Sequence, residues 1–328
     1  MRDWTRKAVL ASRSLRLAAH LQKASAAVLM YHSVLPDPAM HSDLLGGISH
    51  SEVTFRGQME LLARDYQPLS LNILMGCLQR GEALPKRSVA ITFDDGYRDN
   101  VEFAMPILNR LGISATFYLI VDCVENRALP WPSRLRFAFR NSKAKGWCDH
   151  TGKDRELDTR GKREEAFNAS CEFCCRLTGN KQHDFVLRVE EALGIDTPQS
   201  SLMMTYGQAK ELIHRGHSVG SHTMSHPNMA FVEEDEGLGE FTESKQLLTA
   251  RLNTVIRHFA YPAPALSPNW NEQTVTLCRK AGYESAVTTN NGLVHSGDNP
   301  LHLKRIRPTK TVEGLRWNLE KAFAGRIA

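Results

Sequence analysis

The stretch SVAITFDDGY, residues 88–97, decides the predicted fold of this chain. Its first six residues, Ser88–Phe93, carry no charge and include β-branched and aromatic side chains, which is typical of a strand buried on both faces. The strand ends at two acidic residues and a glycine, Asp94–Gly96. Strands that alternate with helices of about 10–15 residues indicate a parallel sheet or barrel. We therefore predict an α/β fold with its active site at the carboxyl ends of the strands.

Outward from this strand, the same rhythm covers most of the chain. Strands are predicted at 26–31, 114–121, 217–222, 256–261, 284–289 and 303–307, and helices at 54–65, 70–81, 99–111, 206–215, 239–253, 271–281 and 312–324. Residues 123–203 interrupt the rhythm, because they are charged, rich in cysteine and helical in pattern, without strand-like runs. We interpret this segment as an insertion in one catalytic domain.

Composition places the chain among soluble globular proteins, since 42% of its 328 residues are apolar and 23% are charged. The formal net charge of +5 comes from 41 basic and 36 acidic residues, but residues 1–23 alone hold six basic side chains and one acid. The other 305 residues are balanced, at 35 of each sign. The net charge of the body therefore steers no particular partner to it, and we predict no nucleic-acid binding.

Residues 1–25 form a basic segment in which Leu10, Leu17 and Leu21 share one helical face. Such a segment could lie on an anionic membrane surface, and a helix docked on the main domain is the alternative. No run of about 18–20 apolar residues is present. Basic residues also interrupt the apolar core that a signal peptide needs.

Seven cysteines, an odd number in a long chain, favour a reducing compartment over a disulfide-linked secreted protein. We therefore predict a cytoplasmic protein, with peripheral contact at the inner membrane surface as the option that residues 1–25 leave open. Three cysteines, Cys171, Cys174 and Cys175, form a C-x-x-C-C cluster. Zinc binding there would need a fourth ligand such as Cys148, so buried thiols on an insertion helix are the preferred interpretation.

Two polar clusters follow predicted strands. Asp94 and Asp95 are adjacent carboxylates that repel each other unless a cation or a proton is nearby, although alone they also fit a solvated turn. His222 and His226 are four residues apart, so both imidazoles can converge on one metal ion if the chain makes a single helical turn between them, although alone they also fit a surface loop. Together, the clusters predict a His₂Asp site for a divalent metal with hydrolytic chemistry.

At the aspartate pair and the histidine pair, the chain resembles the polysaccharide deacetylases, the family that contains the NodB homology domain. The motif T-F-D-D-G stands at Thr92–Gly96, and H-[ST]-x-x-H stands at His222–His226. Leu29–Val34 is similar to the Y-H-x-V opening of the branch that includes deacetylases of exported poly-N-acetylglucosamine. His258–Pro262 is similar to the third motif of that branch.

The resemblance covers roughly residues 27–310. It implies a distorted (β/α) barrel of the NodB type over residues 26–328, with a mainly helical insertion at about 123–203. It also implies removal of N-acetyl groups from a glycan, an N-acetylated polysaccharide or oligosaccharide of the chitooligosaccharide or exopolysaccharide class. Hydrolysis of another non-peptide C–N bond and a catalytically silent, glycan-binding relative are the alternatives.

The resemblance assigns roles to individual residues. It implies a divalent metal ion, zinc with cobalt or nickel as alternatives, bound by Asp95, His222 and His226. Asp94 would be the general base that takes a proton from the metal-bound water as this water attacks the acetamide. The backbone N–H of Ala263 would be an oxyanion donor, and Pro262 beside it would contact the substrate.

The chain departs from the family pattern at two of these roles. Ala260 stands where the third motif often has an arginine that orients the catalytic aspartate. Arg305, at the end of the last strand, is our candidate for that role, and a surface ion pair is the equally weighted alternative. The late motif that carries the usual acid has no clear match, so His302 and His32 are the candidates, unless they are structural or bind the sugar.

Two aromatic residues could contact the sugar. Tyr206 stands where this branch often has tryptophan, and Trp131 opens the insertion between two prolines. Aromatic faces stack on sugar rings, but packing in the core or in a lid is at least as well supported by the sequence. The sequence makes no prediction of the oligomeric state.

Overall fold

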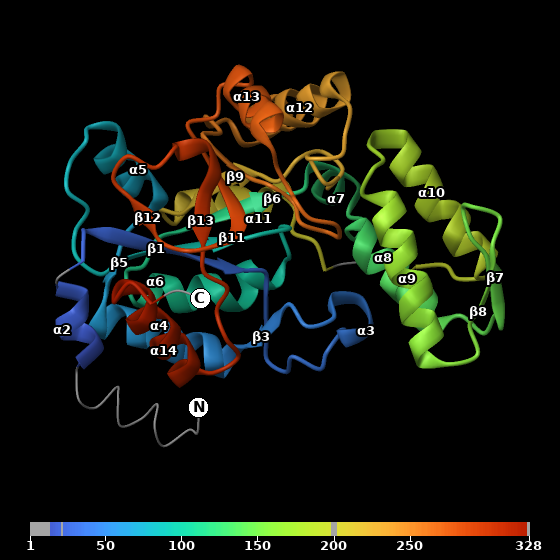
Figure 1. Cartoon of the computed structure of the whole chain (residues 1–328), viewed down its shortest axis with the longest axis horizontal. Helices are drawn as coiled ribbons and strands as arrows, with labels where there is room; N and C mark the ends of the chain where they lie inside the picture. Colours follow the sequence, from blue (N-terminus) through green and yellow to red (C-terminus); the bar gives the residue numbers. More distant parts are fainter. Residues whose placement is uncertain (1–13, 21, 198–201, 327–328) are drawn as a thin grey trace.

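The computed structural model describes residues 14–20, 22–197 and 202–326, and Figure 1 shows how they are arranged. A parallel sheet curls into a barrel, and helices cover its outer surface. The helices of the predicted insertion lie together at one side of the barrel. This arrangement confirms the predicted α/β barrel.

Seven parallel strands form the barrel and follow one another in chain order. They are β1 (Ser25–Tyr31), β5 (Ser88–Phe93), β6 (Ala115–Leu119), β9 (Ser218–Ser221), β10 (His258–Ala260), β11 (Ser285–Asn291) and β13 (Leu303–Arg305). A parallel bridge between Leu29 and Ile306 links the last strand to the first, so the barrel is nearly closed. Two short strands extend the sheet: β4 (Gln67–Pro68) beside β5, and β12 (Val294–His295), which runs antiparallel to β1.

The register of the sheet places the two polar clusters on one edge. β6 pairs with β5 on one side and with β9 on the other. The Asp94–Asp95 pair directly follows β5, and His222 directly follows β9. Because parallel strands end at the same edge of a sheet, the carboxylates and the first histidine are separated by the width of a single strand.

Most predicted barrel helices start and end within two residues of their predicted bounds, but the helix predicted at 239–253 begins five residues earlier. Two further helices, the first two named next, have no predicted bounds. The barrel helices are α2 (Ser14–His20), α3 (Ser42–Leu45), α4 (Glu52–Asp65), α5 (Leu71–Gln79), α6 (Met105–Arg110), α11 (Tyr206–His214), α12 (Glu234–Leu252), α13 (Glu272–Lys280) and α14 (Val312–Phe323). The helix predicted at 99–111 begins with a π-helical turn, Asn100–Ala104. Pro106 lacks an N–H for the α-helical ladder, which explains why regular α-helix begins only at α6.

The insertion builds its own apolar core. Its helices are α7 (Val121–Asn126), α8 (Trp131–Asn141), α9 (Arg160–Cys174) and α10 (Gly179–Ala192). Side chains from α8, α9 and α10 bury one another in a cluster of their own. The expectation that this segment holds no strands is wrong, because β7 (Gly146–Cys148) and β8 (Asp154–Glu156) pair as an antiparallel hairpin. These three-residue strands are too short for a periodic apolar pattern to reveal them. A further short pair, β2 (Ser33–Leu35) and β3 (Ser49–Ser51), lies beside the barrel.

The N-terminal helix α2 rests on the barrel. Leu15 is buried, whereas Leu17 is 68% exposed. Leu10 and Leu21, the other members of the predicted apolar face, lie outside the described residues. Within the described ranges, none of the helices has the length and hydropathy that a bilayer-spanning segment requires.

Candidate metal centre

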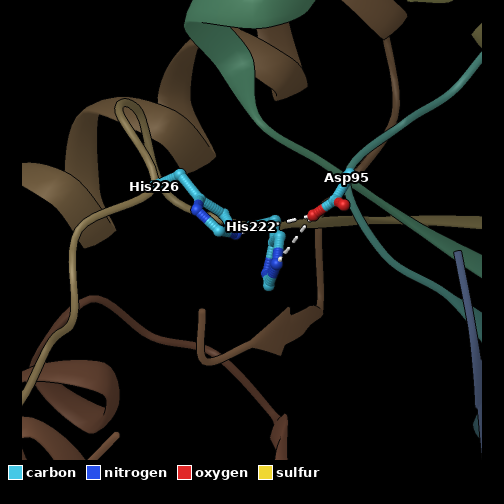
Figure 2. Close-up of side chains that lie close together, drawn as sticks. All are labelled: Asp95, His222 and His226. Atoms are coloured by element: carbon cyan, nitrogen blue, oxygen red, sulfur yellow. Dashed lines mark ion pairs between the residues drawn. The ribbon is translucent and has the colours of Figure 1, made fainter. Parts of the chain in front are cut away.

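Asp95, His222 and His226 lie together at the carboxyl ends of β5 and β9 (Figure 2). Nε2 of each histidine is 3.5 Å from Oδ1 of Asp95, and one potential ligand atom from each residue lies within 4.8 Å of the others. All three side chains are buried. One carboxylate and two imidazoles at this spacing are a donor set for a divalent metal ion that leaves positions open to water or substrate.

The backbone around these side chains is unusual. Asp95, Thr223 and His226 have φ angles of 74°, 71° and 65°, in the left-handed region that residues with a side chain rarely occupy. Gly96 follows at 86°, and a Cβ there would come within 2.9 Å of Leu119. The turn after β5 therefore requires glycine. Such strained residues persist where the surrounding structure holds them, and they cluster at functional sites.

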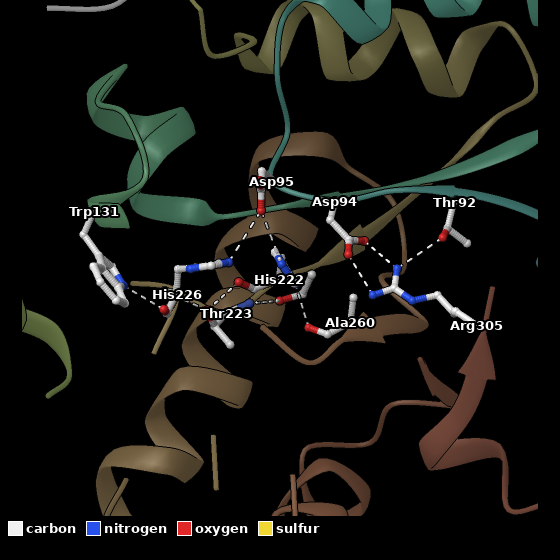
Figure 3. Close-up of polar contacts among 10 residues, drawn as sticks. Thr92, Asp94, Asp95, Trp131, His222, Thr223, His226, Ala260 and Arg305 are labelled. Carbon is white, nitrogen blue, oxygen red and sulfur yellow. Dashed lines mark hydrogen bonds and ion pairs between the residues drawn. The ribbon is translucent and has the colours of Figure 1, made fainter. Parts of the chain in front are cut away.

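Hydrogen bonds orient the imidazole of His222 and hold the backbone of His226 (Figure 3). Nδ1 of His222 is 2.7 Å from the carbonyl oxygen of Ala260, so the tautomer with a proton on Nδ1 satisfies this contact and leaves Nε2 free to bind a metal ion. The indole N–H of Trp131 donates to the carbonyl of His226 at 2.8 Å, and the N–H of His226 donates to Oγ1 of Thr223. The donor atoms and their orientation thus fit a divalent metal ion.

Asp94 lies outside this donor set and is held by Arg305 (Figure 3). Both guanidinium Nη atoms donate to the carboxylate, one to each oxygen, at 2.7 Å, and Nε donates to the carbonyl of Thr288. Both side chains are buried, so Arg305 is not part of a surface ion pair. Burial favours the neutral acid, but Arg305, with His222 and His32, outweighs it, so the pKa of Asp94 lies below its ordinary value. Asp94 is therefore an ionised carboxylate in a fixed orientation.

Glu240, from α12, supports the loop between the two histidines. The backbone N–H groups of Met224 and Ser225 donate to its carboxylate at 2.7 and 3.0 Å, and the Ser225 hydroxyl donates at 2.6 Å. Burial raises the pKa of Glu240 to about 7. Neither this role nor the contact of Trp131 with His226 follows a sequence motif: Glu240 reaches the loop from the next helix, and Trp131 reaches it from a helix 95 residues earlier.

A cavity of about 150 Å³ opens onto the two aspartates and the two histidines. His32 and Ala263 also line it, so the structure brings these two candidates to the site. Burial lowers the pKa of His32, and the carboxylates of Asp95 and Asp94 oppose that effect. The N–H of Ala263 donates to no acceptor among the described residues, which leaves it available to an oxyanion.

Three other candidates are absent from the described lining of this cavity. His302 precedes β13, whereas the site lies where the strands end, and its ring stacks on Trp270 with centroids 4.7 Å apart. Tyr206 packs against the barrel core, 5.7 Å from the guanidinium carbon of Arg251. Pro262 is buried beside Ala263. The structure therefore brings none of the three into the cavity.

The clustered cysteines lie away from this centre, in the core of the insertion. Cys171, Cys174 and Cys175 are buried, whereas Cys148 is exposed. Burial raises the pKa of all three buried thiols, that of Cys175 to about 11. They are thus protonated, apolar-like side chains at neutral pH, which favours packing over metal binding.

Known proteins resemble this chain in sequence and in fold. A sequence model described as polysaccharide deacetylase matches residues 81–151 and 186–286, just over half of the chain. YxkH of Bacillus subtilis, whose name assigns it provisionally to the polysaccharide deacetylases, is 23% identical over 288 residues, which are 88% of this chain and 72% of that protein. Among solved structures, the deacetylase PplD of Streptococcus pyogenes, in complex with acetate, has a TM-score of 0.61 at 21% identity and covers 90% of this chain and 98% of its own. IcaB from Ammonifex degensii has a TM-score of 0.59 at 18% identity, and the match covers 92% of this chain and 99% of IcaB.

Proposed function

Because this chain belongs to the polysaccharide deacetylase family and is thus a hydrolase of carbon–nitrogen bonds, we propose that it is a metal-dependent enzyme that removes N-acetyl groups from a glycan. The substrate is an N-acetylated polysaccharide or oligosaccharide of the chitooligosaccharide or exopolysaccharide class. The metal is zinc, since two neutral imidazoles and one carboxylate are a common zinc donor set.

The observation that carries this proposal is the contrast between two adjacent carboxylates. Oδ1 of Asp95 lies 3.5 Å from an imidazole nitrogen of each histidine. The carboxylate of Asp94 instead forms an ion pair with the guanidinium of Arg305, at 2.7 Å. Environments that separate two neighbouring acids in this way assign them different roles in catalysis. Asp95 serves as a metal ligand, and Asp94 remains free of the metal to act as a base.

The chain's own residues supply the proton transfers. A divalent ion held by Asp95 and the two histidines would polarise the acetamide carbonyl and make water more acidic. Asp94 is ionised and lies in the wall of the same cavity, so it can accept a proton from the attacking water. Because Arg305 fixes both oxygens of Asp94, the position of the base does not depend on the substrate.

The remaining steps need an oxyanion donor and an acid. Ala263 lines the cavity and has a free N–H, so it is the proposed donor to the oxygen on which negative charge develops. His32 is the one histidine of the described lining that does not belong to the metal-ligand set. We therefore assign the protonation of the leaving amine to His32 and not to His302.

The test is acetate release from N-acetylglucosamine oligomers by the full chain, together with its zinc content. Chelation is expected to abolish release and added zinc to restore it. Asp94→Asn should lower kcat by roughly 10²–10⁴-fold and keep the bound zinc, because Asp94 is not a ligand. His222→Ala should lose the zinc as well. Asp184→Asn, the same change at an exposed position on α10, should alter neither. A wild-type protein that binds no divalent metal and releases no acetate would overturn the proposal.

A further inference from the structure

A second cavity, of about 530 Å³, adjoins the metal-site cavity. The two cavities share two lining residues, Thr289 and Arg307. The second cavity lies between the ends of β11 and β13 and helix α14. We call it the basic groove, and its wall includes Thr289, Asn291, Arg307, Asn318, Lys321 and Arg326.

The basic groove carries positive charge that the surrounding structure does not neutralise. No aspartate or glutamate belongs to its described lining. Arg305 reaches the groove, but Asp94 matches its charge. Arg307, Lys321 and Arg326 form no ion pair with any carboxylate in the described part of the chain. Elsewhere on the surface, arginines such as Arg257 are commonly paired with carboxylates.

The excess of positive charge continues into the metal-site cavity. Arg307 lines both cavities, and Arg136 of α8 lines the metal-site cavity as well. The nearest carboxylate to Arg136 in an ion pair is that of Glu164, at 3.9 Å, at the outer limit of such a contact. A ligand that extends from the metal site into the groove therefore meets guanidinium groups along its path.

We propose that the basic groove is a binding subsite for an anionic group of the glycan, a carboxylate or a phosphate, carried on a sugar next to the N-acetylated one. This inference rests on the function proposed for the metal site. A guanidinium group presents parallel N–H donors that match carboxylate and phosphate oxygens, and the Lys321 ammonium adds a point charge. The amides of Asn291 and Asn318 are of the type that binds sugar hydroxyls. The volume is within the range of sites for small ligands.

Continuity with the metal-site cavity favours substrate as the occupant over a separate macromolecular partner. Arg307 is the shared residue, so a ligand bound there is within reach of the reacting acetamide. The balanced charge of residues outside the N-terminal segment also means that no general basic surface explains these three cations. They act locally, on what enters the groove.

The experiment compares three matched sets of N-acetylglucosamine-containing oligosaccharides with the zinc-loaded full chain: neutral, carboxylate-bearing and phosphate-bearing. We expect kcat/KM to be at least tenfold higher for one anionic set than for the neutral set, mainly through KM, and the preferred set identifies the anion. The double variant Arg307→Gln/Lys321→Gln should reduce that ratio about tenfold. Lys86→Gln, a change of one charge at an exposed site before β5, should leave the ratio unaltered.

The outcomes separate this inference from the proposed function. If acetate is released at equal rates from all three sets and the double variant behaves in the same way, the proposed anion subsite is wrong. The deacetylase function would still stand. Absence of release from every set would contradict the proposed function, and the groove is then judged by calorimetric binding of the anionic oligosaccharides. Binding that is lost in the double variant supports the subsite, and binding that is absent or unaffected overturns it.

Discussion

The metal-site cavity and the basic groove touch each other, yet they are built in opposite ways. In the cavity, both catalytic-site carboxylates have partners: Asp94 has Arg305, and Asp95 faces two histidines. The groove exposes cations whose charge no described carboxylate balances, among them Arg307 and Arg326. The cavity is thus complete before substrate arrives, whereas the groove is completed by what binds in it.

This difference separates reaction from selection. Buried, mutually oriented groups hold their geometry without a substrate, which is what proton transfer and charge stabilisation require. Exposed cations gain little until an anion with matching shape is present. Changes in the cavity should therefore cost stability, metal binding and rate, and changes in the groove should alter the choice of substrate by smaller amounts.

The largest effect is expected for Arg305→Met. This change leaves the buried Asp94 carboxylate without its cation, and breaking a buried pair costs about 3–5 kcal/mol of unfolding free energy. Urea unfolding at neutral pH measures it. The control is Arg257→Met, which removes an exposed partner of Glu284 and should cost less than about 1 kcal/mol. Equal losses in the two variants would show that the Asp94–Arg305 pair is not buried as described.

The next largest effect is expected on metal affinity, from a change at Trp131, which supports the ligand His226 and does not itself bind the metal. Trp131→Phe removes the N–H that donates to the carbonyl of His226, a residue already held in a left-handed conformation. Loss of such an outer partner typically weakens metal binding 10- to 100-fold. Competition with a zinc chelator measures the affinity.

The matched control for this prediction is Trp147→Phe. Trp147 is also buried and also belongs to the insertion, but it packs on Phe139, away from the metal ligands. The Trp147→Phe change should destabilise the insertion without changing the affinity for zinc. A similar loss of affinity in both variants would mean that the insertion as a whole, and not the single hydrogen bond, holds His226 in place.

A smaller effect follows from Glu240. In the unfolded chain its pKa is about 4.3, whereas burial raises the folded value to about 7. Between these values the folded state holds a proton on Glu240 that the unfolded state has lost, so the contribution of Glu240 to the unfolding free energy should fall as pH rises from about 4.5 to 7 and then level off. The expected size of this contribution is about 3 kcal/mol, since one pH unit is worth about 1.4 kcal/mol.

Urea unfolding of the chelated protein at pH 5 and pH 8 tests this dependence. Glu240→Gln cannot titrate, so its stability should fall less than that of the wild type over the same interval. Glu234→Gln, at an exposed position of the same helix, should follow the wild type. Parallel behaviour of wild type and Glu240→Gln would contradict the shifted pKa.

The contrast between cavity and groove also explains what could be predicted from the sequence. Strand–helix alternation predicts a parallel sheet or barrel, since each strand and helix is a local pattern, and the family resemblance narrows this to the barrel. Asp95 and His226 stand in short motifs at strand ends, and parallel topology alone brings strand ends together. Arg305 was a candidate for the same reason. His302 was placed by its nearness in sequence to a family motif, and the structure puts it ahead of β13 instead of after it.

No comparable signal exists for contacts made between distant segments. Trp131 meets His226 only because the insertion folds back on the barrel. Arg307, which follows β13, and Lys321 of α14 line the same cavity. Their charges cannot be recognised in the sequence, because the net charge of the residues outside the N-terminal segment is zero. Tertiary packing brings such pairs together, and spacing along the chain does not encode it.

The smallest effect is expected for a single, partly exposed cation of the groove. Lys321→Gln should raise KM for the preferred anionic oligosaccharide two- to threefold at low salt, because an exposed ion pair is worth about 0.2–1 kcal/mol. The difference from wild type should disappear at 1 M salt, where the screening length is about 3 Å. Rates on the neutral oligosaccharide supply the reference at each salt concentration. A difference that persists at high salt would show that Lys321 is desolvated when substrate binds, and the groove would then resemble the cavity more closely than its exposed side chains suggest.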